Sequence, residues 1–250
     1  MNLIKCFSIL FVTLLLATPG MAADEAPNYL SVELGPAWQT KNDQRIPGTS
    51  GTTFSLSKMD PGPFFTYRLY AGRKFNNRHE LRLLFAPLQF EIKGQFRSPV
   101  KYIGSDFAAE TETTAFYKFN SYRLTYAYHF DPISQWELAL GFTAKVRDAE
   151  VRLTQGNKLE RKTNIGFVPL LHFQARRPLF ADLFFRFDFD GLAAPQGRAF
   201  DAALFLERSF IAPAYTFFLG YRTVEGGANN DTVYNFAWFH YALGGVRASF

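Results

Sequence analysis

The sequence predicts an all-β chain that closes into an antiparallel, up-and-down transmembrane β-barrel of about ten strands, within a range of about eight to twelve. One observation is that no segment beyond the N-terminal leader has the roughly 20 consecutive apolar residues that a membrane-spanning helix needs. The other is that apolar and polar residues alternate through most of the chain, as they do in strands with two different faces. A closed barrel follows because a bilayer tolerates no unpaired backbone groups.

Residues 1–22 resemble a cleaved secretory signal peptide. Lys5 supplies the positive charge, residues 7–17 form a short apolar core, and Gly20 and Ala22 are small residues before the expected cleavage point. The apolar core is shorter than a bilayer-spanning helix. We therefore expect export, with residues 23–250 forming one barrel domain. The single cysteine, Cys6, lies in the leader, so the mature chain is expected to lack disulfide bonds.

Composition excludes some partners. The chain carries a net charge of +5, and loss of Lys5 with the leader leaves +4. The basic residues are spread along the sequence, whereas nucleic-acid-binding proteins cluster them on one face, so no nucleic-acid partner is expected. Aromatic residues make up 18% of the chain, with 29 phenylalanines, and they are interleaved with polar residues. This dispersal is typical of strands that face lipid on one side.

The predicted strands follow from the alternation, taken in order along the chain. Residues 181–190 show it most clearly, because Leu183, Phe185, Phe187 and Phe189 share one face while the other face carries Arg186 and three aspartates. The complete set of expected strands is 29–40, 64–75, 79–96, 115–130, 136–154, 161–176, 181–190, 198–209, 215–224 and 232–250.

The connections are expected to alternate between short turns and longer exposed loops. Turn residues occupy 75–78, 131–134, 177–180 and 211–214. The longer loops are expected at 41–63, 97–114, 155–160, 191–197 and 225–231. Even strand numbers place both termini on the side of the short turns.

Three prolines fall inside expected strands, where each removes a hydrogen-bond donor. Because a closed barrel has no edge, the sequence predicts local bulges at Pro36, Pro87 and Pro169. At Pro87 the apolar parity changes. Leu81, Leu83 and Phe85 are expected to face lipid before it, and Leu88, Phe90 and Ile92 after it, as one extra residue would allow.

The opposite face of the strands collects charges of both signs, which we expect to line the barrel interior. They are Glu33, Arg68, Arg123, Glu137, Lys145, Arg176, Arg186, Asp188, Asp201, Glu207, Arg222 and Arg247. A barrel of about ten strands leaves little room beyond side chains, so a filled, paired ionic interior is the first expectation. The alternative is a narrow channel for small solutes, in which Arg68, Arg123, Arg186 and Arg222 form a basic wall that favours anions.

The last ten residues resemble the closing strand of bacterial outer-membrane β-barrel proteins. The chain ends on Phe250, with Ala248, Val246, Gly244 and Ala242 on the same parity. The resemblance implies that Tyr241, Val246 and Phe250 belong to the signal read by the barrel-assembly machinery. It also implies location in the outer membrane, contact with its lipids and lipopolysaccharide, and a monomeric barrel.

Enzymatic activity is not the first expectation. His240 would face lipid near the outer leaflet, where lipid A deacylases work, but the serine that this family has two residues after its histidine is replaced by Ala242. Omptin-type proteases pair Asp with Asp and Asp with His at the outer rim, and no outer-rim histidine accompanies Asp188, Asp190 and Asp201. A lipid-modifying hydrolase ranks third, after a structural or surface-interaction barrel and a channel. No metal or cofactor motif is present.

Overall fold

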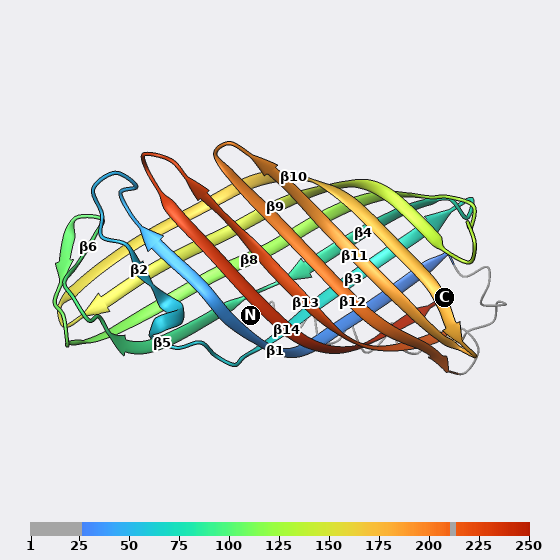
Figure 1. The fold of residues 1–250 in the computed structure, drawn as a ribbon, viewed down its shortest axis with the longest axis horizontal. Helices are drawn as coiled ribbons and strands as arrows, with labels where there is room; N and C mark the ends of the chain where they lie inside the picture. Colours follow the sequence, from blue (N-terminus) through green and yellow to red (C-terminus); the bar gives the residue numbers. More distant parts are fainter. Residues whose placement is uncertain (1–26, 211–213) are drawn as a thin grey trace, which may run out of the picture.

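The computed structural model describes residues 27–210 and 214–250, and the predicted leader lies outside these ranges. Ten long antiparallel strands follow one another around a closed barrel (Figure 1), and β1 pairs with β14 from Tyr29–Ser249 to Arg45–Tyr234. The barrel strands are β1 (Asn28–Arg45), β3 (Phe64–Phe75), β4 (His79–Ala86) continued by β5 (Gln89–Gln95), β8 (Glu112–His129), β9 (Glu137–Gln155), β10 (Lys158–Phe180), β11 (Leu183–Ala194), β12 (Gly197–Phe210), β13 (Tyr215–Asn229) and β14 (Tyr234–Ser249). The expected fold and strand order are confirmed.

The outer surface of the barrel carries a belt of exposed apolar side chains. Phe65, Phe142, Phe167 and Leu219 are each about two-thirds exposed or more. On the same strands Phe65 and Phe142 are followed by the buried residues Thr66 and Thr143, which is the alternation that the sequence predicted. A soluble protein rarely leaves so continuous an apolar surface uncovered. Within the described ranges, no helix is long and apolar enough to cross a membrane.

Short turns join the strands at the end of the barrel where the C-terminus lies, at the right of Figure 1. The backbones of Asn28 and Phe250 exchange two hydrogen bonds there, of 3.0 and 2.9 Å, which tie the two ends of the chain together. Asn76 and Asn77 adopt positive φ angles in the turn between β3 and β4, a conformation that asparagine tolerates better than most residues.

At the opposite end, three of the expected long loops are short. β9, β10, β11, β12 and β13 continue past the apolar belt and end in tight connections at 156–157, 195–196 and 230–233. Strand pairing continues there because the two arms of each hairpin still satisfy each other's backbone groups. The expectation of long loops at 155–160, 191–197 and 225–231 is therefore wrong.

The two remaining long connections fold over this end of the barrel instead of standing free in solvent. They contain β2 (Phe54–Ser55), the short 3-10 helix η2 (Leu56–Lys58), and the hairpin of β6 (Val100–Tyr102) and β7 (Ser105–Phe107). Leu56, Tyr102 and Phe107 are fully buried. The Tyr102 hydroxyl donates a hydrogen bond of 3.1 Å to the Val151 carbonyl, and burial raises the pKa of this phenol.

The predicted change of parity at Pro87 does not occur. Pairing with β8 keeps one register across the proline, from Ala86–Ser121 to Gln89–Lys118. Leu88, Phe90 and Ile92 therefore point into the barrel and not toward lipid. They join an apolar core that fills the outer half of the lumen, where Phe90 packs against the rings of Tyr117 and Phe239. The sequence reading was wrong because an apolar side chain can face either lipid or an apolar core.

The other two prolines also lack the expected bulges. Pairing of β1 keeps one register past Pro36, and the shift falls further along, between Gln39 and Lys41. At Pro169, β10 is in register with β9, but its pairing with β11 begins only at Leu171. Pro169 therefore lies where β10 extends beyond its neighbour, and the barrel has a local edge that accommodates the missing donor.

Candidate functional site in the barrel interior

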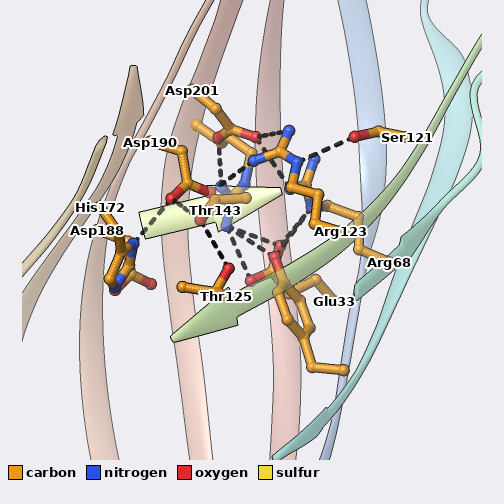
Figure 2. Close-up of polar contacts among 12 residues, drawn as sticks. Glu33, Arg68, Ser121, Arg123, Thr125, Thr143, His172, Asp188, Asp190 and Asp201 are labelled. Atoms are coloured by element: carbon orange, nitrogen blue, oxygen red, sulfur yellow. Dashed lines mark hydrogen bonds and ion pairs between the residues drawn. The ribbon is translucent and has the colours of Figure 1, made fainter. Parts of the chain in front are cut away.

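The centre of the lumen is occupied by an ionic network with Asp201 of β12 at its middle (Figure 2). One carboxylate oxygen of Asp201 accepts hydrogen bonds from Arg68 of β3 at 3.0 Å and Arg123 of β8 at 2.7 Å, and the other accepts from Arg222 of β13. Arg222 also donates to both carboxylate oxygens of Glu33 of β1, at 3.0 Å each. All five residues are at least nine-tenths buried. Strand closure brings them together, since they come from five different strands.

A second arm of the same network contains a paired aspartate and histidine. Asp190 of β11 lies directly opposite His172 of β10, and their Oδ1 and Nδ1 atoms are 2.8 Å apart. The other ring nitrogen, Nε2, lies 2.8 Å from Arg82. A guanidinium can only donate, so Nε2 accepts and Nδ1 carries the proton that is donated to Asp190. Thr143 and Arg123 also donate to Asp190, at 2.9 and 2.7 Å. Because both ring nitrogens are engaged, neither is free to act as a general base.

Sequence reasoning missed this pair. The alternation puts His172 and Asp190 on the inward faces of successive strands, but a hairpin register carried back from the turn at 181–182 would place His172 opposite Gly191. The register shift between Pro178 and Phe180 is what brings His172 opposite Asp190. What the sequence did not show was Arg82, which comes from β4 on a distant part of the chain and occupies the second ring nitrogen.

Nearer the short turns, Glu207 is the shared acceptor of a further cluster. It is completely buried, and it accepts from Arg186 at 2.5 Å and from Arg176 at 3.2 Å. Arg247 approaches it to 3.8 Å. Arg186 also donates to Asp188 and stacks over the Phe205 ring, 4.4 Å from its centroid. These contacts neutralise the carboxylate.

Most of the charges that the sequence assigned to the interior are buried there. Those that are at least nine-tenths buried are Glu33, Arg68, Arg123, Lys145, Arg186, Asp188, Asp201, Glu207 and Arg222. Arg176 and Arg247 are partly exposed. Glu137 is an exception, because its side chain is 48% exposed at the short-turn rim, where it pairs with Arg176 at 3.0 Å. It begins β9, where β9 pairs with β10 but not with β8, because the β8–β9 pairing ends at Ala139.

The four arginines that the sequence assigned to a basic wall are all paired with carboxylates. Arg68, Arg123 and Arg222 share Asp201 as an acceptor, and Arg186 pairs with Glu207 and Asp188. Cavities between these side chains are small. One of about 20 Å³ lies among Arg68, Arg82 and His172, a second of about 20 Å³ lies beside Phe119 and Arg123, and a third of about 30 Å³ lies beside Arg147. Such volumes hold one or two water molecules.

His240 lies on the outside of the barrel, as expected, but it has a partner that the sequence did not reveal. Thr40 has the same outward parity as Trp38 and lies at the register shift between Gln39 and Lys41, and its hydroxyl lies 3.0 Å from His240 Nε2. Tyr221 contacts the other ring nitrogen, and Trp238 packs 5.2 Å from the imidazole. Both nitrogens are satisfied on a surface that is otherwise apolar. Across the described residues, no three His, Cys, Asp or Glu side chains are arranged to hold a metal ion.

The assembly-signal residues lie on both faces of β14. Tyr241 is buried inside the lumen, whereas Val246 is partly exposed and Phe250 is 39% exposed on the side of the short turns. Their recognition by an assembly machinery stays a prediction.

Comparison with known proteins supports the fold and no more. No protein-family model and no curated protein matches the chain. Among solved structures, the outer membrane protease OmpT from Escherichia coli aligns over 94% of this chain and 99% of its own, at 9% identity and a TM-score of 0.52. The chain has the fold of bacterial outer-membrane β-barrel proteins. The attachment invasion locus protein Ail of Yersinia pestis (12% identity, 88% and 99% coverage, TM-score 0.42) and Neisserial surface protein A (15%, 89% and 97%, 0.37) are also similar.

Proposed function

We propose that this protein is an integral outer-membrane β-barrel with a closed ionic interior, and that its role is structural or surface-interacting, not catalytic. The observation that carries the proposal is the pairing of the central arginines. The side chains that would have to line an anion pathway are instead bonded to Asp201, Asp188 and Glu207. The apolar core around Phe90 and Phe239 adds a second obstruction.

Location in the outer membrane is supported by the fold and by the exposed apolar belt. In this proposal residues 1–22 direct export, and the strand that ends in Tyr241, Val246 and Phe250 is read by the barrel-assembly machinery. The mature barrel then stands as a monomer among outer-membrane lipids and lipopolysaccharide.

A surface role is supported by the part of β10 that has no pairing with β11. β10 extends well beyond β11, and its residues 158–170 pair only with β9. This segment and the adjoining part of β9 carry Lys158, Arg161, Lys162 and Arg152. The projecting sheet therefore presents backbone and charged side chains on the side opposite the short turns.

Single-channel recording tests the proposal against the channel alternative. Protein folded in detergent is inserted into a planar bilayer, and folding is verified by β-type circular dichroism and by heat-modifiable migration in gel electrophoresis. We expect no discrete conductance steps under a salt gradient. Reproducible steps that favour anions would refute the closed interior and make the lumen a pore.

A further inference from the structure

One part of β10 has no neighbouring strand on one of its edges. β10 is paired with β9 from its first residue onward, but β11 pairs with it only from Leu171 toward the short turns. Residues 158–170 therefore leave one edge open over about 40 Å, since each residue adds about 3.3 Å. Among the described residues, no backbone hydrogen bond from a turn or loop reaches them. We call residues 161–168 the free edge, because β7 approaches the tip through a hydrogen bond of 2.7 Å from Ser105 to Glu160.

Pro169 indicates which peptide groups face the open side. It has no N–H group, yet the register between β9 and β10 continues through it. Proline is tolerated in a sheet where its nitrogen faces away from the ladder. Hydrogen-bonding direction alternates along a strand, so residues with the parity of Pro169 also turn their N–H and C=O groups to the open side. Thr163, Ile165 and Phe167 therefore form a row of unpaired donors and acceptors.

The middle of the free edge has none of the features that usually prevent the addition of another strand, which include charged residues, proline and bulges. Residues 163–168 contain neither a charged residue nor a proline, and their register with β9 has no shift. The side chains of Ile165 and Phe167 are 75% and 68% exposed. An extended segment along this edge would gain main-chain hydrogen bonds and apolar contacts on alternate side chains.

The opposite face of the free edge carries two cations. Lys162 has the same parity as Gly166, and Gly166 lies directly opposite Arg147 of β9. The Arg147 guanidinium lies over Gly166, since its Nη2 is 3.1 Å from the position that a Cβ atom would take there. Within the described residues, the ion pairs of this hairpin use neither Lys162 nor Arg147. Acidic side chains on an added strand would meet both cations.

A second copy of this chain does not fit the free edge. Two identical barrels with the same orientation in one membrane are related by a two-fold axis along the membrane normal. Their strands are tilted by about 35–45° from that normal, so the two edges would cross at about 70–90° and could not form a ladder. The two Lys162 side chains would add repulsion between like charges.

We propose that the free edge of β10 binds an extended acidic peptide segment of a partner protein by β-strand addition. The inference rests on the surface-interaction part of the proposed function, and its test is separate from the conductance test. A silent barrel that binds no peptide overturns this inference alone. Conductance steps in a barrel that binds the peptide overturn the closed interior alone.

The test measures the binding of a fluorescent peptide, Thr-Val-Glu-Val-Thr-Val-Glu-Val-Thr, to the whole protein folded in detergent. Its two glutamates have the spacing of Lys162 and Gly166, and its valines would lie opposite the free donors. Fluorescence anisotropy should show saturable binding that weakens as salt is added. Absence of binding would overturn the proposal.

Two altered peptides test the two parts of the recognition on the unaltered protein. A peptide with lysine in place of both glutamates should bind more weakly, because it repels Lys162 and Arg147. A peptide that is N-methylated at its valines cannot form the ladder and should not bind. If either peptide binds as tightly as the acidic one, the proposal is wrong.

Variants locate the site. Ile165→Pro removes one free N–H group, and its matched control Ile165→Thr keeps that group and should bind the acidic peptide at least about fivefold more tightly, the effect of one hydrogen bond. Lys162→Met should weaken binding by up to about fivefold, the effect of one exposed ion pair. Lys93→Met should not, because this lysine lies on β5 and 3.9 Å from Glu112. Heat-modifiable migration verifies that each variant folds. Equal binding by the two Ile165 variants would contradict strand addition at this edge.

The oligomeric state distinguishes a peptide from a second copy as the occupant. Sedimentation in density-matched detergent should show a monomer for both the unaltered protein and Ile165→Pro. A dimer that Ile165→Pro dissociates would identify a second copy on the free edge and refute the proposal.

Discussion

Replacement of Asp201 by asparagine tests whether the central network holds the barrel together. The substitution preserves the size of the side chain but removes the charge that three arginines share, Arg68 at 3.0 Å, Arg123 at 2.7 Å and Arg222. The site is 3% exposed, so bulk solvent cannot screen the three guanidinium charges. Loss of one partner of a buried ion pair costs about 3 to 5 kcal/mol.

The remaining contacts of the three arginines narrow the expected loss of unfolding free energy. Arg123 keeps Asp190 at 2.7 Å, and Arg222 keeps Glu33 at 3.0 Å, so no arginine is left without a carboxylate. Arg68 keeps only a longer contact with Glu33, at 3.4 Å. We therefore expect a loss near the lower limit, about 3 kcal/mol of unfolding free energy.

The assay is urea unfolding of the barrel in lipid vesicles, followed by tryptophan fluorescence. Asp131→Asn is the matched control, because Asp131 pairs with Arg78 at a similar distance of 2.8 Å but is 79% exposed in a turn. This surface pair should contribute nothing measurable. If Asp201→Asn is no more destabilising than Asp131→Asn, the argument that burial makes the network energetically important is refuted.

Further substitutions test the other parts of the molecule. Arg186→Leu should cost about 3 to 5 kcal/mol in the same urea assay, because it leaves Glu207 and Asp188 buried with fewer partners; an unchanged midpoint would count against a paired interior. Phe90→Ala should cost about 3 to 5 kcal/mol by opening a cavity in the outer apolar core, whereas a lipid-facing phenylalanine would leave no cavity. Neither the unaltered protein nor His240→Ala should change the acyl content of lipid A when the purified protein is incubated with it and the products are analysed by mass spectrometry. A loss of acyl chains with the unaltered protein but not with His240→Ala would establish a hydrolase. Phe250→Ala should lower the fraction of heat-modifiable protein in outer-membrane preparations, and an unchanged fraction would remove this residue from the assembly signal.

Much of the architecture could be read from the sequence because strand geometry has a period of two. In β11, Phe185 and Phe187 fall on one face and Arg186 and Asp188 on the other, whatever the rest of the chain does. The same rule placed nine of the assigned charges in a buried interior. The number and order of the strands followed from turn residues between the alternating runs.

The alternation rule failed where polarity does not identify the environment. Leu88 and Phe90 were assigned to lipid because they are apolar, but the β4–β5–β8 register turns them into the outer core. Pro169 was assigned a bulge because a closed barrel was expected to have no edge, but β10 extends past β11 and creates one. In both cases the deciding factor was the position of a neighbouring strand.

What the sequence alone determined, then, is which side chains of a strand share a face, since that depends on local backbone geometry. Only the tertiary structure decided which inward charges meet. Asp201 and Arg68 are 133 residues apart, and Arg222 and Glu33 are 189 apart. Their contacts exist because β1 closes on β14, which brings strands that are distant in the chain around one lumen. Among the described residues, the same closure pairs Asp201 and Asp190 with arginines and places no carboxylate oxygen within 4.0 Å of Lys145 Nζ.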